Sequence, residues 1–312
     1  MSILENAYNL PLKQEYVDEM SYRNTHLGIF LNCQFAKSES YEEKLGKDLC
    51  AFTVAEIIEY YKTLCLTSYE TLAVLNSQFK IYTNWCMNRG MVPDNQNHYY
   101  EIINETIISC INTGLAYERI VTRNELLKIL EGAYNSSDVF LALALFEGIC
   151  GKEMCEFNAL NMKAFSKDLT VKLNTGRILK ISGKLYDTAE ESANEYTYYT
   201  MSIRGGIREF KFREYDDSIL KCMYNATMDG DVRQRLYNKL MRMKKNLGAE
   251  CLTTASLTES GRIEMIRNLS KKESISFKEA LIKHKEVEDI YGKVYSYSTF
   301  MLKYGDIIER LE

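Results

Sequence analysis

Apolar residues recur at intervals of three and four along most of the chain, a pattern typical of amphipathic helices. The clearest example is the stretch 69–88, whose apolar positions fall on a single helical face. That face consists of Leu72, Leu75, Phe79, Tyr82 and Trp85. The same spacing predicts helices at about 12–23, 29–37 and 98–111, and a return to helix from residue 216 to the end. The chain is therefore predicted to be mainly helical.

Four helix starts carry a capping box, in which a hydroxyl and a carboxylate three residues apart satisfy the free backbone N–H groups of the first turn. The four pairs are Thr53 with Glu56, Thr67 with Glu70, Thr122 with Glu125, and Ser276 with Glu279. They predict where four of the helices begin.

Two segments alternate apolar and polar residues on either side of a glycine, which predicts small β-hairpins. The first, LTVKLNTGRILKIS, turns at Thr175-Gly176, and the second, YYTMSIRGGIREFKF, turns at Gly205-Gly206. Before them, the continuous apolar run 139–146 predicts a buried helix that leads into the turn LFEGICGKEM. The predicted fold class is mainly α with small hairpins.

Composition narrows the class of protein. The chain has 312 residues, of which 46% are hydrophobic and 26% charged, and these values favour two folded domains over disorder. Nine cysteines form no CxxC pair and no run of 18 apolar residues occurs, so we expect reduced thiols in a cytoplasm and no membrane span. Three histidines lack metal-ligand spacing, and no P-loop, GxGxxG or GxSxG motif is present. No metal or cofactor is therefore expected.

Charge is unevenly distributed in a chain whose net charge is −4. The 69–88 helix directs Ser77, Lys80 and Asn84 away from its apolar face and has no acid after Glu70, which suits a phosphate backbone. The segment 231–247 adds six basic residues, namely Arg233, Arg235, Lys239, Arg242, Lys244 and Lys245. An ordinary solvated helix face is the alternative interpretation of both segments.

Taken together, the order of elements and the local motifs resemble the tyrosine recombinase (phage integrase) family. Residues 51–114, which include TVAEIIEYYKTL and SYETLAVLNSQFKIYTNWCMNRG, resemble its helical core-binding domain, and residues 122–312 resemble its α/β catalytic domain. The resemblance implies a two-domain fold with a linker at 115–121. Residues 1–50 are interpreted as an N-terminal helical extension that forms its own domain, a DNA-contacting arm or a partner surface.

The active-site motifs of that family are altered in this chain. The turn after the buried helix holds Cys150 where the resemblance implies the first catalytic arginine. The histidine-x-x-arginine box falls on ESGR, which retains Arg262 but puts Glu259 in place of the histidine. The later glycine-histidine pair falls on a glycine and Lys293, with His284 as an alternative. A thiol cannot neutralise a phosphate, and losing one such group typically costs about 10² to 10³ in rate.

The resemblance assigns the nucleophile to Tyr304 in FMLKYGDII, with Tyr295 and Tyr297 as weaker candidates. The hairpin lysine of the family corresponds to Arg177 or Lys180. A tyrosine with a pKa near its usual value of about 10 is a poor nucleophile without a phosphate clamp. The chain is therefore predicted not to be an enzyme.

What the resemblance implies instead is a sequence-specific DNA-binding repressor, most similar to the integrase-like lysogeny repressors of SPbeta-type Bacillus phages. It would bind double-stranded operator elements in the bacterial cytoplasm, at the nucleoid, and silence lytic genes. Amides pair with adenine, so Asn76, Gln78 and Asn84 are the candidate base readers. The candidate backbone contacts are Ser77, Lys80, Arg177, Lys180, Arg233, Arg235, Lys239, Arg242 and Arg262.

Two other functions stay open. One is an active site-specific recombinase that uses Tyr304, and the other is a helical protein-interaction module without a DNA role. In the repressor interpretation, the helical tail 290–311 exchanges between protomers of a homodimer, and a phage-encoded antirepressor or regulator is a further expected partner.

Overall fold

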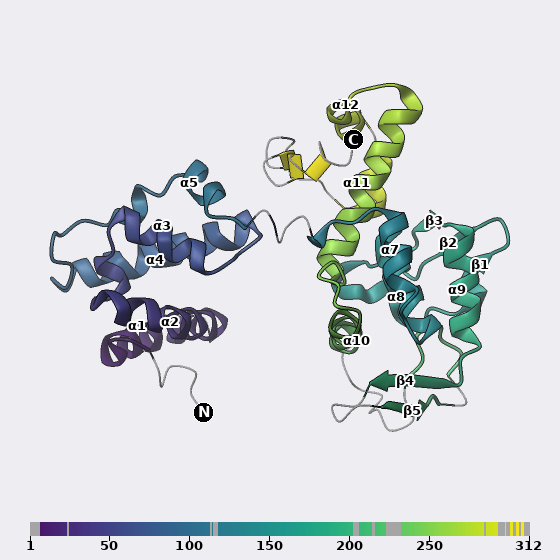
Figure 1. Ribbon diagram of the computed structural model, residues 1–312, viewed down its shortest axis with the longest axis horizontal. Helices are drawn as coiled ribbons and strands as arrows, with labels where there is room; N and C mark the ends of the chain where they lie inside the picture. The colour runs from purple at the N-terminus through teal and green to yellow at the C-terminus, as the bar shows by residue number, and fades with distance from the viewer. Residues whose placement is uncertain are drawn as a thin grey trace. The chain divides into compact units, whose positions relative to one another are not determined.

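A computed structural model of the chain describes residues 7–23, 25–112, 114, 118–201, 206–213, 216–222, 232–283 and 285–292, together with positions 297, 300, 301, 304, 305, 307 and 308. The chain divides into two compact units, Met1–Thr113 and Gly114–Glu312 (Figure 1). Within the described residues, no helix is long and apolar enough to cross a membrane.

The N-terminal unit packs its helices around one aromatic core. Its elements are α1 (Leu10–Arg23), α2 (Thr25–Leu45), the 3-10 turn η2 (Leu49–Ala51), α3 (Val54–Thr63), α4 (Tyr69–Met87), the 3-10 turn η3 (His98–Tyr100) and α5 (Asn104–Ser109). The rings of Tyr16 in α1 and Phe35 in α2 lie 5.0 and 4.9 Å from that of Tyr82 in α4. The predicted boundary at residue 50 does not hold, because the segments on both sides of it build the same core.

Helix starts are the best-predicted local features. The boxes at Thr53, Thr122 and Ser276 are all formed. The predicted box at Thr67 is wrong, because Ser68 caps α4 by accepting a hydrogen bond from the Thr71 amide. The predicted apolar stripe of α4 is buried throughout. Short side-chain capping motifs therefore locate helix starts to within a residue in this chain.

Two helices of this unit differ from their predicted extents. The predicted helix 98–111 is broken, because the backbone at Ile103 is extended, with φ −84° and ψ 173°. Asn97 caps the short turn η3 by accepting from the Tyr99 amide at 3.2 Å, and α5 begins only after the extended residue. Helix α2 is longer than the predicted 29–37 at both ends.

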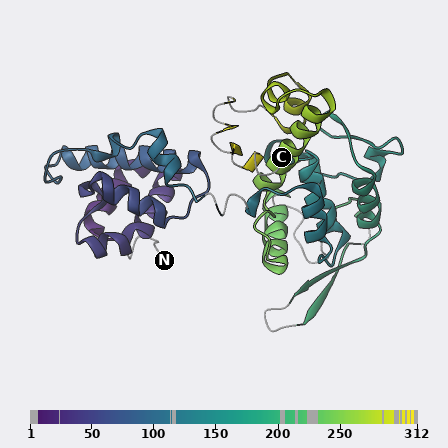
Figure 2. The ribbon, with the colours of Figure 1, turned by 45° about the horizontal axis from the view of Figure 1, so that its top comes forward.

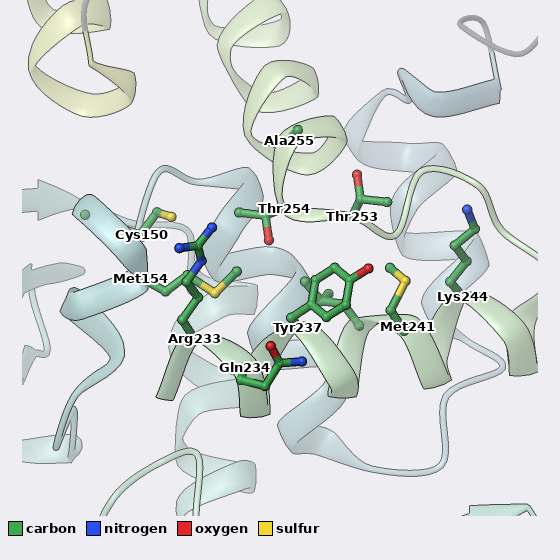
Figure 3. A pocket seen from close by; sticks show the side chains of 12 residues that line it. Cys150, Met154, Arg233, Gln234, Tyr237, Met241, Lys244, Thr253, Thr254 and Ala255 are labelled. Carbon is green, nitrogen blue, oxygen red and sulfur yellow. The ribbon is translucent and has the colours of Figure 1, made fainter. Parts of the chain in front are cut away.

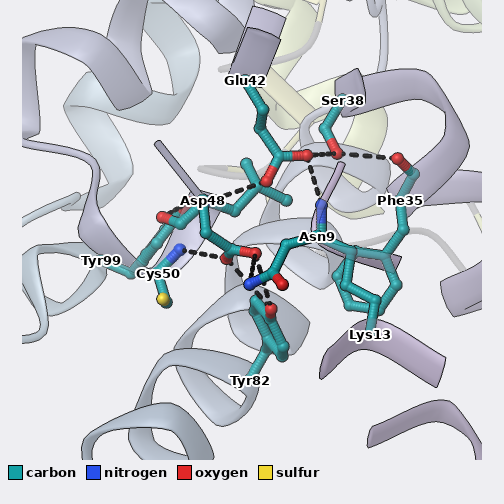
Figure 4. Close-up of polar contacts among 10 residues, drawn as sticks. Asn9, Lys13, Phe35, Ser38, Glu42, Asp48, Cys50, Tyr82 and Tyr99 are labelled. Atoms are coloured by element: carbon teal, nitrogen blue, oxygen red, sulfur yellow. Dashed lines mark hydrogen bonds and ion pairs between the residues drawn. The ribbon is translucent and has the colours of Figure 1, made fainter. Parts of the chain in front are cut away.

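Two buried carboxylates join these helices (Figure 4). Glu42 of α2 forms an ion pair with Lys13 of α1 and accepts a hydrogen bond from the Leu49 amide at 2.8 Å. Both side chains of the ion pair are 0% exposed. Burial raises the pKa of the Glu42 carboxyl to about 7, although the Lys13 ammonium opposes that rise. The second carboxylate, Asp48, accepts from the Tyr82 hydroxyl at 3.0 Å.

The C-terminal unit surrounds the apolar helix α8 (Ser136–Phe146), which is buried from Phe140 to Phe146 as predicted. The other helical elements of the unit are α7 (Arg123–Leu130), η4 (Lys152–Phe157), η5 (Met162–Ala164), α9 (Gly183–Ala193), α10 (Val232–Leu247), α11 (Thr254–Glu273), α12 (Phe277–Lys283), which packs against α11, and α13 (Lys285–Tyr291). Strands β1 (Phe165–Ser166), β2 (Thr170–Lys172) and β3 (Ile178–Lys180) form an antiparallel sheet in that order. Both predicted hairpins are present.

The second hairpin consists of β4 (Thr197–Met201) and β5 (Ile207–Lys211), and Figure 2 shows it projecting from the helices of its unit. The predicted return to helix from residue 216 is wrong for the described residues 216–222. There, the Asp216 carboxylate closes a turn by accepting from the amides of Ser218 and Cys222 at 3.1 and 2.7 Å. Helix α10 begins only at Val232.

Two glycines bring α8, α11 and α13 into close contact. A Cβ atom at Gly261 in the middle of α11 would lie 1.7 Å from the carbonyl oxygen of Phe146, at the end of α8. Gly148 has φ +90°, and a Cβ atom there would lie 2.3 Å from the Ile290 side chain. The turn after α8 is thus held against α11 and α13 by positions that only glycine fits.

Candidate nucleic-acid interface

The turn after α8 is fixed by its glycines and by a buried carboxylate. Gly148 and Gly151 adopt positive φ values of +90° and +66°, which other residues rarely reach. The Cys150 amide, between them, donates a hydrogen bond to Glu156 at 2.9 Å. The Glu156 side chain is 0% exposed. The backbone of Cys150 is therefore fixed by a buried carboxylate.

Arg177, in the first hairpin, completes the same network. Its Nε and Nη2 atoms donate to the two carboxylate oxygens of Glu156 at 2.7 and 2.6 Å. Its remaining N–H groups donate to the carbonyl oxygens of Gly148, Asp289 and Ile290 at 2.7 to 2.8 Å. Burial alone would raise the pKa of Glu156, but the hydrogen bonds from Arg177 and its other donors lower it, so the carboxyl is ionised at neutral pH. The guanidinium is committed to the fold.

A second ion pair holds the start of the same turn. Glu147, the residue after α8, accepts from Arg123 of α7 at 2.5 Å. It also accepts from the Ser182 hydroxyl and amide at 2.6 and 2.8 Å. The glutamates on either side of Cys150 therefore both bind arginines of the same unit.

Cys150 opens onto a groove of about 890 Å³ between the turn, α10 and the start of α11 (Figure 3). It is lined by Cys150, Gly151, Met154, Arg233, Gln234, Tyr237, Leu240, Met241, Lys244, Thr253, Thr254 and Ala255. Burial and the neighbouring Glu156 raise the pKa of the Cys150 thiol to about 11, so it stays protonated at neutral pH. None of these twelve residues is acidic, and two of them, Arg233 and Lys244, are basic.

Arg262 and Glu259 lie on α11 away from this groove. Arg262 is 4% exposed, and it donates to Glu259 at 3.0 Å and to the Tyr291 carbonyl. The residues of α11 that share the groove with Cys150 are the neutral Thr254 and Ala255, at the beginning of the helix (Figure 3). The predicted phosphate contact of Arg262 does not fit its burial.

Tyr304 belongs to the apolar cluster of the C-terminal helices. Its side chain is 6% exposed and its ring lies 5.0 Å from that of Phe300. Tyr297 packs against the same cluster. Three further candidates lie outside the described residues, namely His284, Lys293 and Tyr295. The described structure therefore places the predicted nucleophile in a core and not along the groove.

The basic helix α10 is only partly a surface feature. Lys239 is 8% exposed, and its ammonium lies 3.2 Å from Asp138 and 2.8 Å from the Ser137 hydroxyl. Burial lowers its pKa, although Asp138 opposes that change. Arg242 lies over the Tyr198 ring at 5.5 Å. The predicted DNA contact of Lys239 does not fit this burial, because the lysine is the internal partner of an aspartate.

Other basic side chains do face outward. Arg233 is exposed and lines the groove, as does Lys244, which pairs with Glu250 at 2.5 Å. Lys180 is exposed on β3. Arg235 is half-buried and contacts the Cys222 sulfur. Of the predicted cations, Arg233, Lys245 and Lys180 are therefore exposed, and Lys244 is half-buried at the groove.

In the N-terminal unit, the predicted amide readers on α4 are engaged or enclosed. Asn76 is 2% exposed and accepts from the Tyr61 hydroxyl at 2.9 Å, so its predicted contact with bases does not fit. The Gln78 side-chain oxygen is buried without a hydrogen bond in the described structure. Asn84 donates to the Tyr100 hydroxyl at 2.9 Å and accepts from Asn97 at 2.8 Å.

The outward positions of α4 are different ones. Ser77 is exposed as predicted, and the Lys80 ammonium lies 5.3 Å from the centre of the Tyr100 ring. On the same exposed face are Val74 and Ile81, whose side chains are 53% and 45% exposed. Neither residue was predicted to be exposed, although both lie opposite the apolar stripe at a spacing of seven, which places them on one helical face.

Comparison with known proteins agrees with this architecture. Residues 120–299 match the family described as MrpR, C-terminal catalytic domain, and residues 7–88 match the family described as MrpR, N-terminal core-binding domain. The chain is also similar to the SPbeta prophage-derived uncharacterized protein YopR of Bacillus subtilis (strain 168), with 21% identity over 282 residues. That alignment covers 86% of this chain and 84% of YopR. The matches have the predicted order, a core-binding domain followed by a catalytic-like domain.

Proposed function

Because the chain belongs to the MrpR family of tyrosine recombinase-like proteins, we propose that it binds specific double-stranded DNA elements as a repressor and does not cleave them. The observation that carries the proposal is the groove at Cys150. A neutral thiol stands there at the position where the resemblance implies the first catalytic arginine, and the two cations that line the groove, Arg233 and Lys244, come from α10 instead.

The internal ion pairs support the absence of cleavage. Strand transfer through a tyrosine needs cations placed where negative charge develops on the phosphate. Arg177 is bound to Glu156 and to three backbone carbonyls. Arg262 is bound to Glu259 and to the Tyr291 carbonyl. Releasing Arg177 toward a phosphate would take the charged partner from the fully buried Glu156 carboxylate, which is costly.

The outward cations support retained DNA binding. Lys80 in the N-terminal unit and Lys180 and Arg233 in the C-terminal unit are candidates for contacts with the backbone phosphates. Such contacts give affinity and position, and the resulting binding weakens steeply as salt rises. An interaction module without a DNA role would show no such salt dependence.

The similarity to a protein of the SPbeta prophage supports a role in phage biology. In the proposed function, the protein occupies operators of a prophage in the bacterial cytoplasm and silences lytic genes. It acts as a homodimer through its C-terminal helices, and a phage-encoded antirepressor relieves the repression.

The test uses duplexes selected by the full-length protein from a randomised DNA pool. A suicide version of the selected duplex, nicked so that a covalent adduct accumulates, is incubated with the wild type and with Tyr304→Phe. We expect salt-dependent binding by both proteins and no adduct with either. An adduct that forms with the wild type and disappears in Tyr304→Phe would establish the alternative, an active recombinase that uses Tyr304.

The single variant Cys150→Arg sharpens the test. It restores one cation at the groove but leaves Arg177 and Arg262 in their ion pairs, so we expect it to bind the duplex without cutting it. Even slow cleavage by this variant would show that the other arginines are available for catalysis.

A further inference from the structure

The exposed face of α4 carries apolar side chains that no part of its own unit covers in the described structure. Val74 and Ile81 are 53% and 45% exposed, although the buried stripe of the same helix is well packed. Ser77 lies between them on the same face. Exposed apolar side chains aligned along one helix face are typical of a recognition surface.

The polar groups beside this face are already engaged. Asn84 is held by Tyr100 and Asn97, and Asn76 is buried, so neither amide is placed to form a pair of hydrogen bonds with adenine. The large exposed side chains of α4 are therefore those of Val74 and Ile81, which are apolar. On DNA, the apolar group available in the major groove is the C5 methyl of thymine.

Charge favours the same partner. The helix has no acid after Glu70, and Lys80 lies beside the exposed face, its ammonium 5.3 Å from the Tyr100 ring. A lysine at the edge of a helix that lies in a groove is suited to a backbone phosphate. A protein surface of mixed charge would not favour a helix whose only acid lies in its first turn.

We propose that Val74 and Ile81 read thymine methyl groups in the major groove, an inference that rests on the proposed DNA binding. The major groove is wide enough to admit an α-helix. The two residues are two helical turns apart, a rise of about 10 Å, and base pairs stack at about 3.4 Å. The operator is therefore expected to hold two contacted thymines about three base-pair steps apart.

The experiment replaces each thymine of a selected duplex, one at a time, with deoxyuridine, which pairs identically but lacks the methyl group. Binding constants are measured at one fixed salt concentration for the wild type, Val74→Ala and Ile81→Ala. We expect the wild type to lose about fourfold in affinity at each of two thymines, as estimated for one methyl-sized apolar contact. Each variant should bind more weakly to the thymine duplex and lose its response to uridine at one of the two sites.

The matched control is Ile29→Ala on α2, because Ile29 is 56% exposed in the same unit. It should keep both responses to uridine. Wild-type binding that is indifferent to every uridine, or responses that persist in both variants, would overturn the inference. So would an equal loss of affinity on thymine and uridine duplexes, which would assign this face to a protein contact. If no duplex is enriched from the pool, the proposed function itself fails.

Discussion

Replacing Glu156 with glutamine is expected to cost the C-terminal unit about 3 kcal/mol of unfolding free energy at neutral pH. The carboxylate is fully buried and accepts four hydrogen bonds, from the Cys150 amide at 2.9 Å, the Thr175 hydroxyl at 2.7 Å and Arg177 at 2.7 and 2.6 Å. Glutamine offers one oxygen and two N–H groups, so at least one donor loses its acceptor and faces another donor.

The magnitude follows from the loss of one partner of a buried ion pair, which typically costs about 3 to 5 kcal/mol. The lower end applies because the Arg177 side chain is 27% exposed and keeps three carbonyl acceptors. The pKa of Glu156 is lowered in the folded state, so its stabilisation is present above its unfolded pKa and is lost as pH falls through the folded value. The difference between wild type and variant should therefore narrow in acid.

Urea unfolding followed by circular dichroism, at pH 7.5 and at pH 3.5, measures both effects. The matched control is Glu250→Gln, whose carboxylate is 37% exposed and pairs with Lys244, and which should cost less than about 1 kcal/mol. If the two variants lose the same small free energy, or if the loss at Glu156 does not narrow in acid, the turn does not depend on this ion pair.

Three further changes test other parts of the fold. Lys13→Met should destabilise the N-terminal unit by about 3 to 5 kcal/mol at pH 8 and by less at pH 5, where the buried Glu42 takes up a proton; an equal loss at both pH values in urea unfolding would contradict this. Gly261→Ala should cost more than about 3 kcal/mol in thermal unfolding, because its Cβ atom would overlap a backbone oxygen of α8, whereas Gly183→Ala, with open space around it, should be nearly neutral. Hydrogen bonds to Glu101 and Asp94 raise the pKa of His98. The unfolding free energy lost in His98→Gln should therefore be largest below about pH 6.5 and should vanish as pH rises through the folded pKa. A loss of unfolding free energy that is constant between pH 5 and pH 9 would refute this prediction.

Features set by neighbouring residues were predictable from the sequence. The apolar stripe of α4, the buried run of α8, three capping boxes and both hairpins all depend on side chains within a few positions of one another. The breaks at 98–111 and after residue 216 were not predictable. At these places the side chain of Asn97 or Asp216 accepts hydrogen bonds from nearby backbone amides, which competes with helix formation. The spacing of apolar residues does not show whether such a turn or a helix will form.

The candidate site was harder to predict because its charges are paired over long sequence separations. Lys239 and Asn76 looked like surface residues by composition, but Lys239 is paired with Asp138 and Asn76 with Tyr61 in the folded chain. Val74 and Ile81 lie outside the predicted apolar stripe and were not predicted to be exposed, yet their side chains are 53% and 45% exposed. The spacing of apolar residues shows which side of a helix faces the core, but it does not show where the buried side ends. Asn76 is buried and its neighbour Ser77 is exposed.

The neutral thiol of Cys150 is best understood together with two arginines of the same unit, Arg177, which binds the same turn, and Arg262, which is bound to Glu259 on α11. A catalytic clamp requires cations that are well positioned yet still free to bind a phosphate, and that freedom depends on there being no buried carboxylate beside them. In this chain, the buried Glu156 and the partly buried Glu259 form ion pairs with Arg177 and Arg262. The thiol at Cys150 is therefore one of several differences from a catalytic clamp. The arginine charges that would stabilise a transition state form ion pairs within the domain instead. A single substitution at Cys150 changes one of these parts, whereas recovery of cleavage would need the ion pairs to be opened as well.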